Sequence, residues 1–215
     1  MRVRLQWRRR RPSFAYPIPP APRTAVLVPR FRSGGGVRVF AGGWSEEVAK
    51  FAPQAIAATL AQFEAIAATG ISLTHAIIIL GRWEDERVSE ADREALWNRF
   101  RVPVFEQIVG RNGTLLAGEC EAHYGLHIES EIVRARLRGC EKRGQTTLST
   151  AEVPRGVNHL RAAAEQSVPF FHIPLSETDR IDESACACGR TTARIISREE
   201  AAREEVKRSM ATYGR

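Results

Sequence analysis

The chain of 215 residues is long enough for one well-buried domain, and its 43% hydrophobic and 27% charged residues are ordinary for a globular protein. Its longest apolar run, residues 76–80, is far too short to cross a bilayer, which excludes a membrane-spanning helix and leaves no reason to expect a membrane partner. The net charge of +7 belongs to the start of the chain, because residues 1–38 contain ten arginines and no acidic residue. The remainder is net negative.

Residues 1–23 combine an arginine cluster with five prolines, which disfavour helix interiors and central strands. We therefore predict a disordered, basic and proline-rich tail over residues 1–23, followed by a single α/β domain over residues 24–215. The prolines also interrupt any apolar segment after the arginines, so we expect no secretory signal and a cytoplasmic location. Nucleic acid is expected as a partner only through this tail, whose arginines could contact phosphates.

A glycine-rich loop at residues 33–36, with the sequence SGGG, separates two apolar runs. Such a loop can bind phosphate when it links a strand to a helix, because its backbone amides then face the anion. Here it leads into a second strand-like run, and no Gly-Lys-Ser/Thr follows. We interpret it as a hinge or a hairpin loop.

From Ser45 to Ile66, apolar residues recur every three to five positions, which predicts helical structure ending before Gly70. Pro53 divides this pattern into a short turn and a longer helix.

An apolar strand is predicted over residues 75–80, followed by a helix that Ser89 caps and that ends near Phe100. A second strand is predicted over residues 102–109. Strand, helix and strand at this spacing make a βαβ unit, so the middle of the chain is α/β.

The elements expected after residue 109 are shorter. They are a strand over residues 114–117, a half-exposed strand over 132–137, a helix over 155–166, a strand over 168–173 and a charged helix over 197–214.

Metal-ligand residue types concentrate in two short segments. Two residues separate Cys120 from His123, and one residue separates Cys186 from Cys188. Together they make a Cys₃His set of the kind that binds tetrahedral zinc, and since the protein fills all four positions, the zinc would be structural. Three alternatives remain: buried free thiols, a disulfide, or His127 as the ligand in place of His123.

Two motifs carry a resemblance to a known family. ECEAHYGLH at 119–127 and ACACGRTTARI at 185–195 resemble segments of the phenylacetate–CoA ligase branch of the adenylate-forming enzymes, and the resemblance extends over residues 84–196. Members of this family use ATP to adenylate an acyl or aryl carboxylate and then transfer the acyl group to coenzyme A. The resemblance implies a partial adenylate-forming-enzyme subdomain, similar to the later part of the family's N-terminal domain. It would have a βαβ core, a short-stranded C-terminal part and a zinc knot.

The sequence differs from the family at the family's nucleotide-binding and catalytic motifs. It has no Ser/Thr/Gly-rich phosphate loop ending in lysine, and residues 105–110 read FEQIVG where the family has Tyr-Gly-x-Thr-Glu. The family's ribose-binding aspartate falls on Glu177, and the lid with its catalytic lysine is mostly absent. The resemblance therefore leaves Glu106 and Glu177 as residual nucleotide-site positions and assigns no catalytic residue.

We therefore expect a truncated, degenerate and non-catalytic relative of phenylacetate–CoA ligase, acting as a zinc-stabilised scaffold or binding module. Its partner would be another protein or a second copy of the chain. The alternative is one subunit of a split acyl- or aryl-CoA ligase that a partner chain completes. ATP or AMP and coenzyme A would be ligands only in that case.

Overall fold

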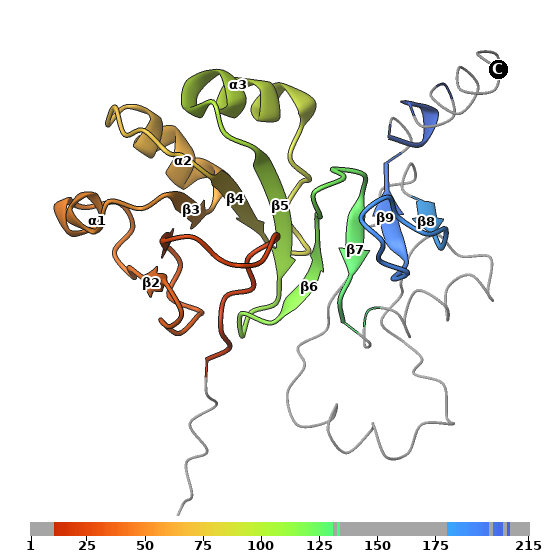
Figure 1. The fold of residues 1–215 in the computed structure, drawn as a ribbon, viewed down its shortest axis with the longest axis horizontal. Helices are drawn as coiled ribbons and strands as arrows, with labels where there is room; N and C mark the ends of the chain where they lie inside the picture. The colour runs from red at the N-terminus through yellow and green to blue at the C-terminus, as the bar shows by residue number, and fades with distance from the viewer. Residues whose placement is uncertain (1–10, 131–132, 134–179, 198–199, 204–205, 207–215) are drawn as a thin grey trace, which may run out of the picture.

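The computed structural model describes residues 11–130, 133, 180–197, 200–203 and 206. Its elements in chain order are β1 (Thr24–Val26), β2 (Val37–Val39), α1 (Glu46–Phe51), β3 (Ala55–Ala58), α2 (Leu60–Ala67), β4 (Ala76–Gly81), α3 (Glu90–Phe100), β5 (Val104–Val109), β6 (Leu115–Gly118), β7 (Leu126–Ile128), β8 (Arg180–Asp182) and β9 (Arg194–Ile196). All nine strands join one sheet in the order β2-β1-β3-β4-β5-β6-β7-β9-β8 (Figure 1). Among the described helices, none has the length and apolar character that crossing a membrane requires.

The sheet changes direction at β5. Strands β1 to β5 pair in parallel, whereas β5 to β9 pair in antiparallel fashion. Helix α3 connects the parallel neighbours β4 and β5, and Ser89 caps it by accepting a hydrogen bond from the backbone N–H of Asp92. The predicted βαβ unit is therefore confirmed, and the whole sheet is mixed α/β rather than purely parallel.

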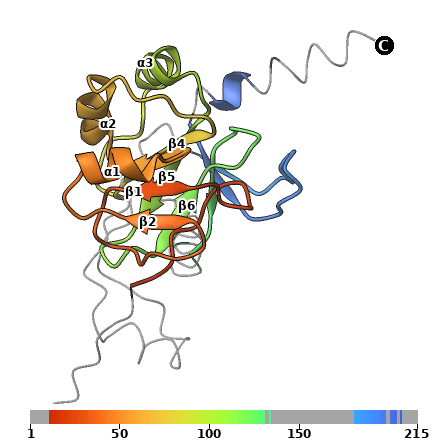
Figure 2. The same cartoon turned by 60° about the vertical axis from the view of Figure 1, so that its left-hand side comes forward.

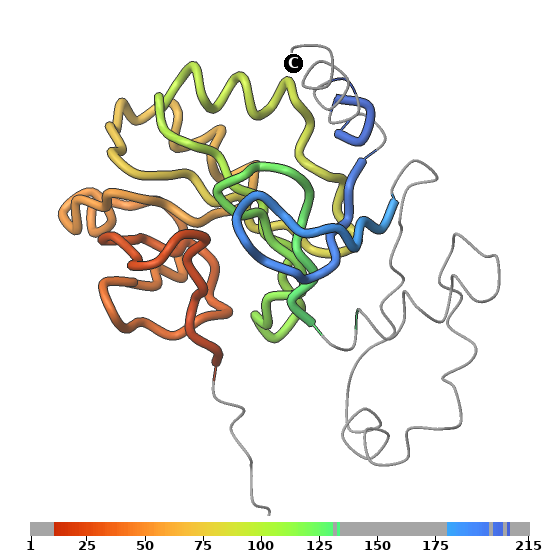
Figure 3. Tube along the Cα trace, turned by 45° about the vertical axis from the view of Figure 1, so that its right-hand side comes forward, coloured from red at the N-terminus to blue at the C-terminus, as the bar shows by residue number. Residues whose placement is uncertain are grey.

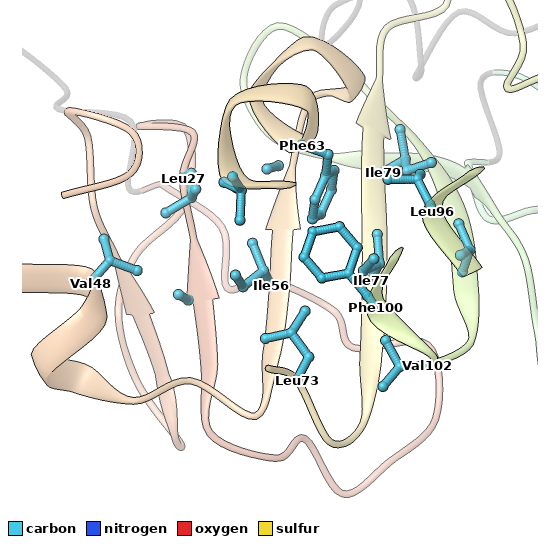
Figure 4. Packing of buried hydrophobic residues seen from close by; sticks show 14 of the residues in the cluster. Leu27, Val48, Ile56, Phe63, Leu73, Ile77, Ile79, Leu96, Phe100 and Val102 are labelled. Carbon is cyan, nitrogen blue, oxygen red and sulfur yellow. The ribbon is translucent and has the colours of Figure 1, made fainter. Parts of the chain in front are cut away.

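Helices α1, α2 and α3 cover the same face of the sheet (Figures 1 and 2). Val48 of α1, Phe63 of α2 and Phe100 of α3 pack in one buried cluster with Ile56 and Ile77 from the strands (Figure 4). Because side chains alternate along a strand, β4 places every second residue in this cluster. Each fully buried side chain of this size stabilises the fold by about 1.5–3 kcal/mol.

Strand β3 corrects one sequence prediction. Residues 55–58 were expected inside a long helix, yet they form a buried strand between β1 and β4, and α2 begins only at Leu60. The alanines in AIAA favour a helix locally, but pairing on both sides of the strand outweighs this weak preference. The capping box of Thr59 and Gln62, in which each residue accepts a hydrogen bond from the other's backbone N–H, marks the true start of the helix.

The opposite face of the sheet carries the segment of residues 11–23, which was expected to be disordered. Phe14 is 7% exposed, and its ring meets Phe31 edge-on with centroids 5.4 Å apart. The side chain of Gln107 in β5 donates a 2.8 Å hydrogen bond to the carbonyl of Ala15. The aromatic residues between the prolines supply enough apolar surface to hold this segment, so for residues 11–23 the structure differs from the prediction.

The glycine-rich loop at residues 33–36 does not join β1 and β2 as a β-hairpin, because these two strands pair in parallel, but Gly34 and Val37 form an isolated antiparallel bridge across a tight turn. The hydroxyl of Ser33 accepts a hydrogen bond from the backbone N–H of Val39, at 3.0 Å, so the loop turns back on its own strand. The elements predicted over 132–137, 155–166 and 168–173 lie outside the described residues. Of the predicted C-terminal helix, residues 200–203 and 206 are described, and they are helical.

Candidate metal centre

The turn between β6 and β7 lies beside the turn between β8 and β9, as the Cα trace shows (Figure 3). Four metal-ligand side chains meet at these two turns. One of them is the second residue after β6, one lies in β7, and two lie in the turn between β8 and β9. Their ligand atoms all lie within 4.8 Å of one another. We call this group the Cys₃His cluster; its members are Cys120, His127, Cys186 and Cys188.

The distances inside the cluster suit a tetrahedral metal ion. The Sγ atoms of Cys120 and Cys186 are 3.7 Å apart, and Cys188 Sγ is 3.5 Å from His127 Nε2. Metal–ligand bonds of about 2.0–2.3 Å imply ligand–ligand edges of about 3.3–3.8 Å in a tetrahedron. The donor set therefore fits a metal such as zinc, and three thiols with one imidazole favour soft or borderline ions over calcium or magnesium.

Strand pairing and two tight turns fix the cluster. Strand β7 pairs with β9, which brings the β8–β9 turn against the β6–β7 turn. Gly125 has φ of 70°, and a Cβ there would lie 2.6 Å from the Ile196 side chain and 2.7 Å from the Ile195 carbonyl, so only glycine fits. In the other turn, the N–H of Gly189 donates to the carbonyl of Cys186 at 2.9 Å.

His127 is oriented for ligation. It is fully buried, and its Nδ1 lies 2.8 Å from the hydroxyl of Thr192, which leaves Nε2 directed at Cys188. A partner on the second ring nitrogen is the usual way in which a protein sets the tautomer of a metal-binding histidine. Burial lowers the pKa of His127, and the positive charges of Arg190 and Arg194 lower it further, so these surroundings favour the neutral imidazole that a metal ligand must be.

The thiols differ in their acidity. Burial raises the pKa of Cys120 to about 12. Burial also acts to raise the pKa of Cys186, but the backbone N–H of Cys188, the side chains of Cys188 and Cys120, and the charge of Arg194 together bring it below its ordinary value. Cys186 is therefore the thiol of this pair that ionises first.

The structure places His123 outside the Cys₃His cluster, and the fourth ligand position belongs to His127, the alternative that the sequence prediction left open. The His123 ring stacks on Phe105 with centroids 4.5 Å apart, and its Nδ1 lies 3.9 Å from a carboxylate oxygen of Glu119. Its backbone has φ of 48°, so it sits in the tight part of the turn. Glu119 and Cys120 are consecutive in the chain, but the Glu119 side chain contacts Arg93 and His123, whereas the Cys120 side chain belongs to the Cys₃His cluster.

Glu106, one of the two expected nucleotide-site acids, lies inside the protein with 1% of its side chain exposed. Arg87 Nε donates to both of its oxygens, at 3.0 and 3.1 Å, and Arg93 donates to Oε2 at 3.1 Å. Arg93 also pairs with the buried Glu119, at 2.8 Å. These four residues make a closed network of two cations and two anions. Glu177, the other expected acid, lies outside the described residues.

The two carboxylates of this network titrate differently. Burial raises the pKa of Glu106 despite the opposing charges of Arg87 and Arg93. Burial also acts against ionised Glu119, but His123 and Arg93 outweigh it and lower the pKa of Glu119. Glu119 also accepts a 2.8 Å hydrogen bond from the backbone N–H of Glu106, which favours its charged form.

Arg87, Arg93 and Arg194 are not among the site residues predicted from the sequence. A buried arginine has the same appearance in a sequence as an exposed one, and the loop and helix around the first two are rich in charge. Only Arg194 left a signal, because it stands next to the apolar pair 195–196 in a segment that reads as a strand.

No protein-family model matches the sequence, and no curated protein matches it. Among solved structures, the fold is similar to an open conformation of 2-hydroxyisobutyryl-CoA ligase in complex with 2-HIB-AMP and CoA, with a TM-score of 0.45 and 12% sequence identity. The alignment covers 82% of this chain and 45% of that ligase, so the chain spans less than half of its length. The similarity is distant.

Proposed function

We propose that this chain is a non-catalytic relative of phenylacetate–CoA ligase, in which a structural zinc site stabilises an α/β scaffold that binds a protein partner or a second copy of the chain. The Cys₃His cluster is the observation that carries this proposal. Its four ligand atoms converge within 4.8 Å, and they come from two of the motifs that resemble the ligase family.

A structural role is supported by the number and position of the ligands. Four protein ligands fill a tetrahedral site, so no position is left for a reacting water or substrate. The site would also join Cys120 to Cys186 across 66 residues of chain. Closing so long a loop removes conformational freedom from the unfolded chain, and binding free energy at such a site becomes folding free energy.

A non-catalytic role is supported by the state of Glu106. Its oxygens are occupied by Arg87 and Arg93 inside the protein, so it could contact magnesium or a nucleotide only after losing both ion pairs. The sequence also offers no phosphate loop ending in lysine. Adenylation needs preorganised positive groups around the phosphates as charge develops, and losing them removes most of the rate enhancement.

Metal analysis of two matched histidine variants tests the zinc site. The wild-type protein, purified under reducing conditions, should hold about one zinc per chain. His127→Ala should lose most of it, whereas His123→Ala, four residues earlier in the turn before β7, should keep it. Zinc that is retained in His127→Ala and lost in His123→Ala would contradict the arrangement of the cluster, and a wild type without metal would overturn the site.

Pyrophosphate exchange into ATP tests the absence of catalysis. With phenylacetate and a panel of aryl and fatty acids, exchange by the purified chain should stay at the level of a Glu106→Ala variant. Exchange clearly above that level would overturn the proposal. If exchange appears only when a second polypeptide is added, the chain is instead one subunit of a split acyl- or aryl-CoA ligase.

A further inference from the structure

Arg194 is a fully enclosed arginine beside the Cys₃His cluster. It lies in β9 with 2% of its side chain exposed, and it is the direct cross-strand neighbour of the ligand His127. An arginine is rarely buried to this degree without a specific partner for its charge. Packing alone therefore does not explain why Arg194 is buried at this position.

The contacts of Arg194 reach both turns that carry the ligands. Its guanidinium lies over the ring of Tyr124, 4.6 Å from the centroid, in the turn between Cys120 and His127. Its Nη2 donates to the Ser184 hydroxyl at 3.0 Å and to the carboxylate of Asp182, at the start of the turn that holds the other two ligands. One side chain thus connects both halves of the site.

Two features of Arg194 remain unexplained by these contacts. Within the described part of the chain, its Nε is buried and has no hydrogen-bond acceptor. The paired carboxylate of Asp182 is also more exposed, at 17%, than the guanidinium at 2%, so solvent screens the anion more than the cation. The charge of the guanidinium is therefore less screened than that of its partner, and one buried N–H of Arg194 has no acceptor among the described residues.

A divalent metal at the Cys₃His cluster would need such a charge. Three thiolates and a neutral imidazole around a divalent ion carry a net charge of about −1, and an uncompensated charge is costly to bury. A neighbouring cation offsets it.

We propose that Arg194 is a positioning residue of the metal centre, which holds the two ligand-bearing turns together and offsets the net negative charge of a divalent metal bound by three thiolates. This inference rests on the proposed metal site.

The test measures zinc affinity by competition with a chromophoric chelator. Arg194→Met keeps the length of the side chain and removes its charge, so it should weaken zinc binding by about tenfold to a hundredfold, as loss of an outer-shell partner does. Arg194→Lys keeps the charge and should recover most of the affinity. Arg190→Met is the comparison variant: Arg190 lies in the β8–β9 turn but is 37% exposed and pairs with Glu129, so its loss should weaken zinc binding much less than the loss of Arg194.

A second pair of variants separates charge from folding. Arg194→Met breaks the ion pair between Arg194 and Asp182, so the double variant Asp182→Asn/Arg194→Met removes both charges of this pair and protects the fold. It should show the same loss of zinc affinity as Arg194→Met, whereas Asp182→Asn alone should not. Cobalt(II) bound in place of zinc should still show thiolate charge-transfer absorption in the double variant, with a weaker affinity.

Three results would overturn the inference. Zinc could bind Arg194→Met as tightly as it binds the wild type, Arg194→Lys could fail to recover the affinity, or Asp182→Asn alone could weaken binding as much as the double variant. In each of these cases the wild type still binds zinc, so the proposed metal site stands. A wild type that binds no zinc removes both the site and this role of Arg194.

Discussion

The sulfur atoms of Cys120 and Cys186 lie 3.7 Å apart, although 66 positions separate the two residues in the chain. Cys120 follows β6 and Cys186 precedes β9, so the pairing of β7 with β9 is what brings them together. A metal bound at the Cys₃His cluster would therefore resist separation of these two strands. This relationship makes stability depend on metal and on the redox state of the thiols.

Removal of zinc should lower the thermal midpoint of the wild-type protein by about 5 °C or more, because a structural site contributes folding free energy directly. The measurement is a thermal unfolding scan with and without a strong chelator. Cys188→Ser should unfold at the lower temperature from the start, and the chelator should change it no further. An identical midpoint for the wild type with and without chelator would contradict the prediction.

Mild oxidation of the metal-free protein should join Cys120 to Cys186, since their sulfur atoms are already close and Cys186 ionises readily. A disulfide between Cys186 and Cys188 would be strained, because only one residue separates them. Peptide mapping by mass spectrometry after treatment with a thiol oxidant identifies the pair. Zinc-loaded protein is the control and should be protected, so equal oxidation with and without zinc would argue against metal binding by these thiols.

Phe14→Ala should lower the free energy of unfolding by about 3 kcal/mol, because Phe14 is buried against Phe31 and its loss leaves a cavity. The measurement is a denaturant titration of both the wild type and the variant. Ile18→Ala is the matched control, since Ile18 is 40% exposed in the same segment and its loss should change stability by less than about 0.5 kcal/mol. Equal stability of Phe14→Ala and the wild type would instead support the sequence prediction that residues 11–23 are disordered.

Glu119→Gln should lower the free energy of unfolding at neutral pH by about 1.5–3 kcal/mol, because Arg93 loses a charged partner. The pKa of Glu119 in the folded protein is below its ordinary value of 4.5, so its contribution is complete above that pH and is lost as the pH falls through the folded-state value. The difference between variant and wild type should therefore shrink in acid. Glu121→Gln is the exposed control, and its free energy of unfolding at neutral pH should lie within about 0.5 kcal/mol of the wild-type value. A difference for Glu119→Gln that stays constant with pH would show that its charge is not responsible.

Regular apolar patterns and caps allowed the centre of the fold to be predicted from the sequence. The strand β4, the helix capped by Ser89 and the strand β5 each carry a local signal, and the structure confirms all three. Strand β3 carries none, because AIAA is compatible with a helix and becomes a strand only between β1 and β4. Its identity is decided by neighbours that lie far away in the sequence.

The candidate site was likewise predicted only in part. Cysteine spacing identified the two segments that meet, but it could not decide between His123 and His127, because the choice depends on which side of the turn faces Cys186. The roles of Arg93 and Arg194 depend on burial, and burial follows from the packing of several elements rather than from the residue itself. In the sequence, Arg93 and Arg194 look like ordinary solvent-exposed residues, but in the structure both side chains are largely buried.

The change from parallel to antiparallel pairing at β5 has a consequence for the order of events during folding. Strands β1 to β5 can assemble from one continuous stretch of chain, whereas the pairing of β7 with β9 must wait for a strand that follows β7 by more than sixty residues. During synthesis the first half of the sheet can form before Cys186 and Cys188 have left the ribosome. Metal capture would then be the final step, so zinc should slow unfolding much more than it speeds folding. In the cell, the supply of metal would govern how long the finished protein survives rather than how quickly it is made.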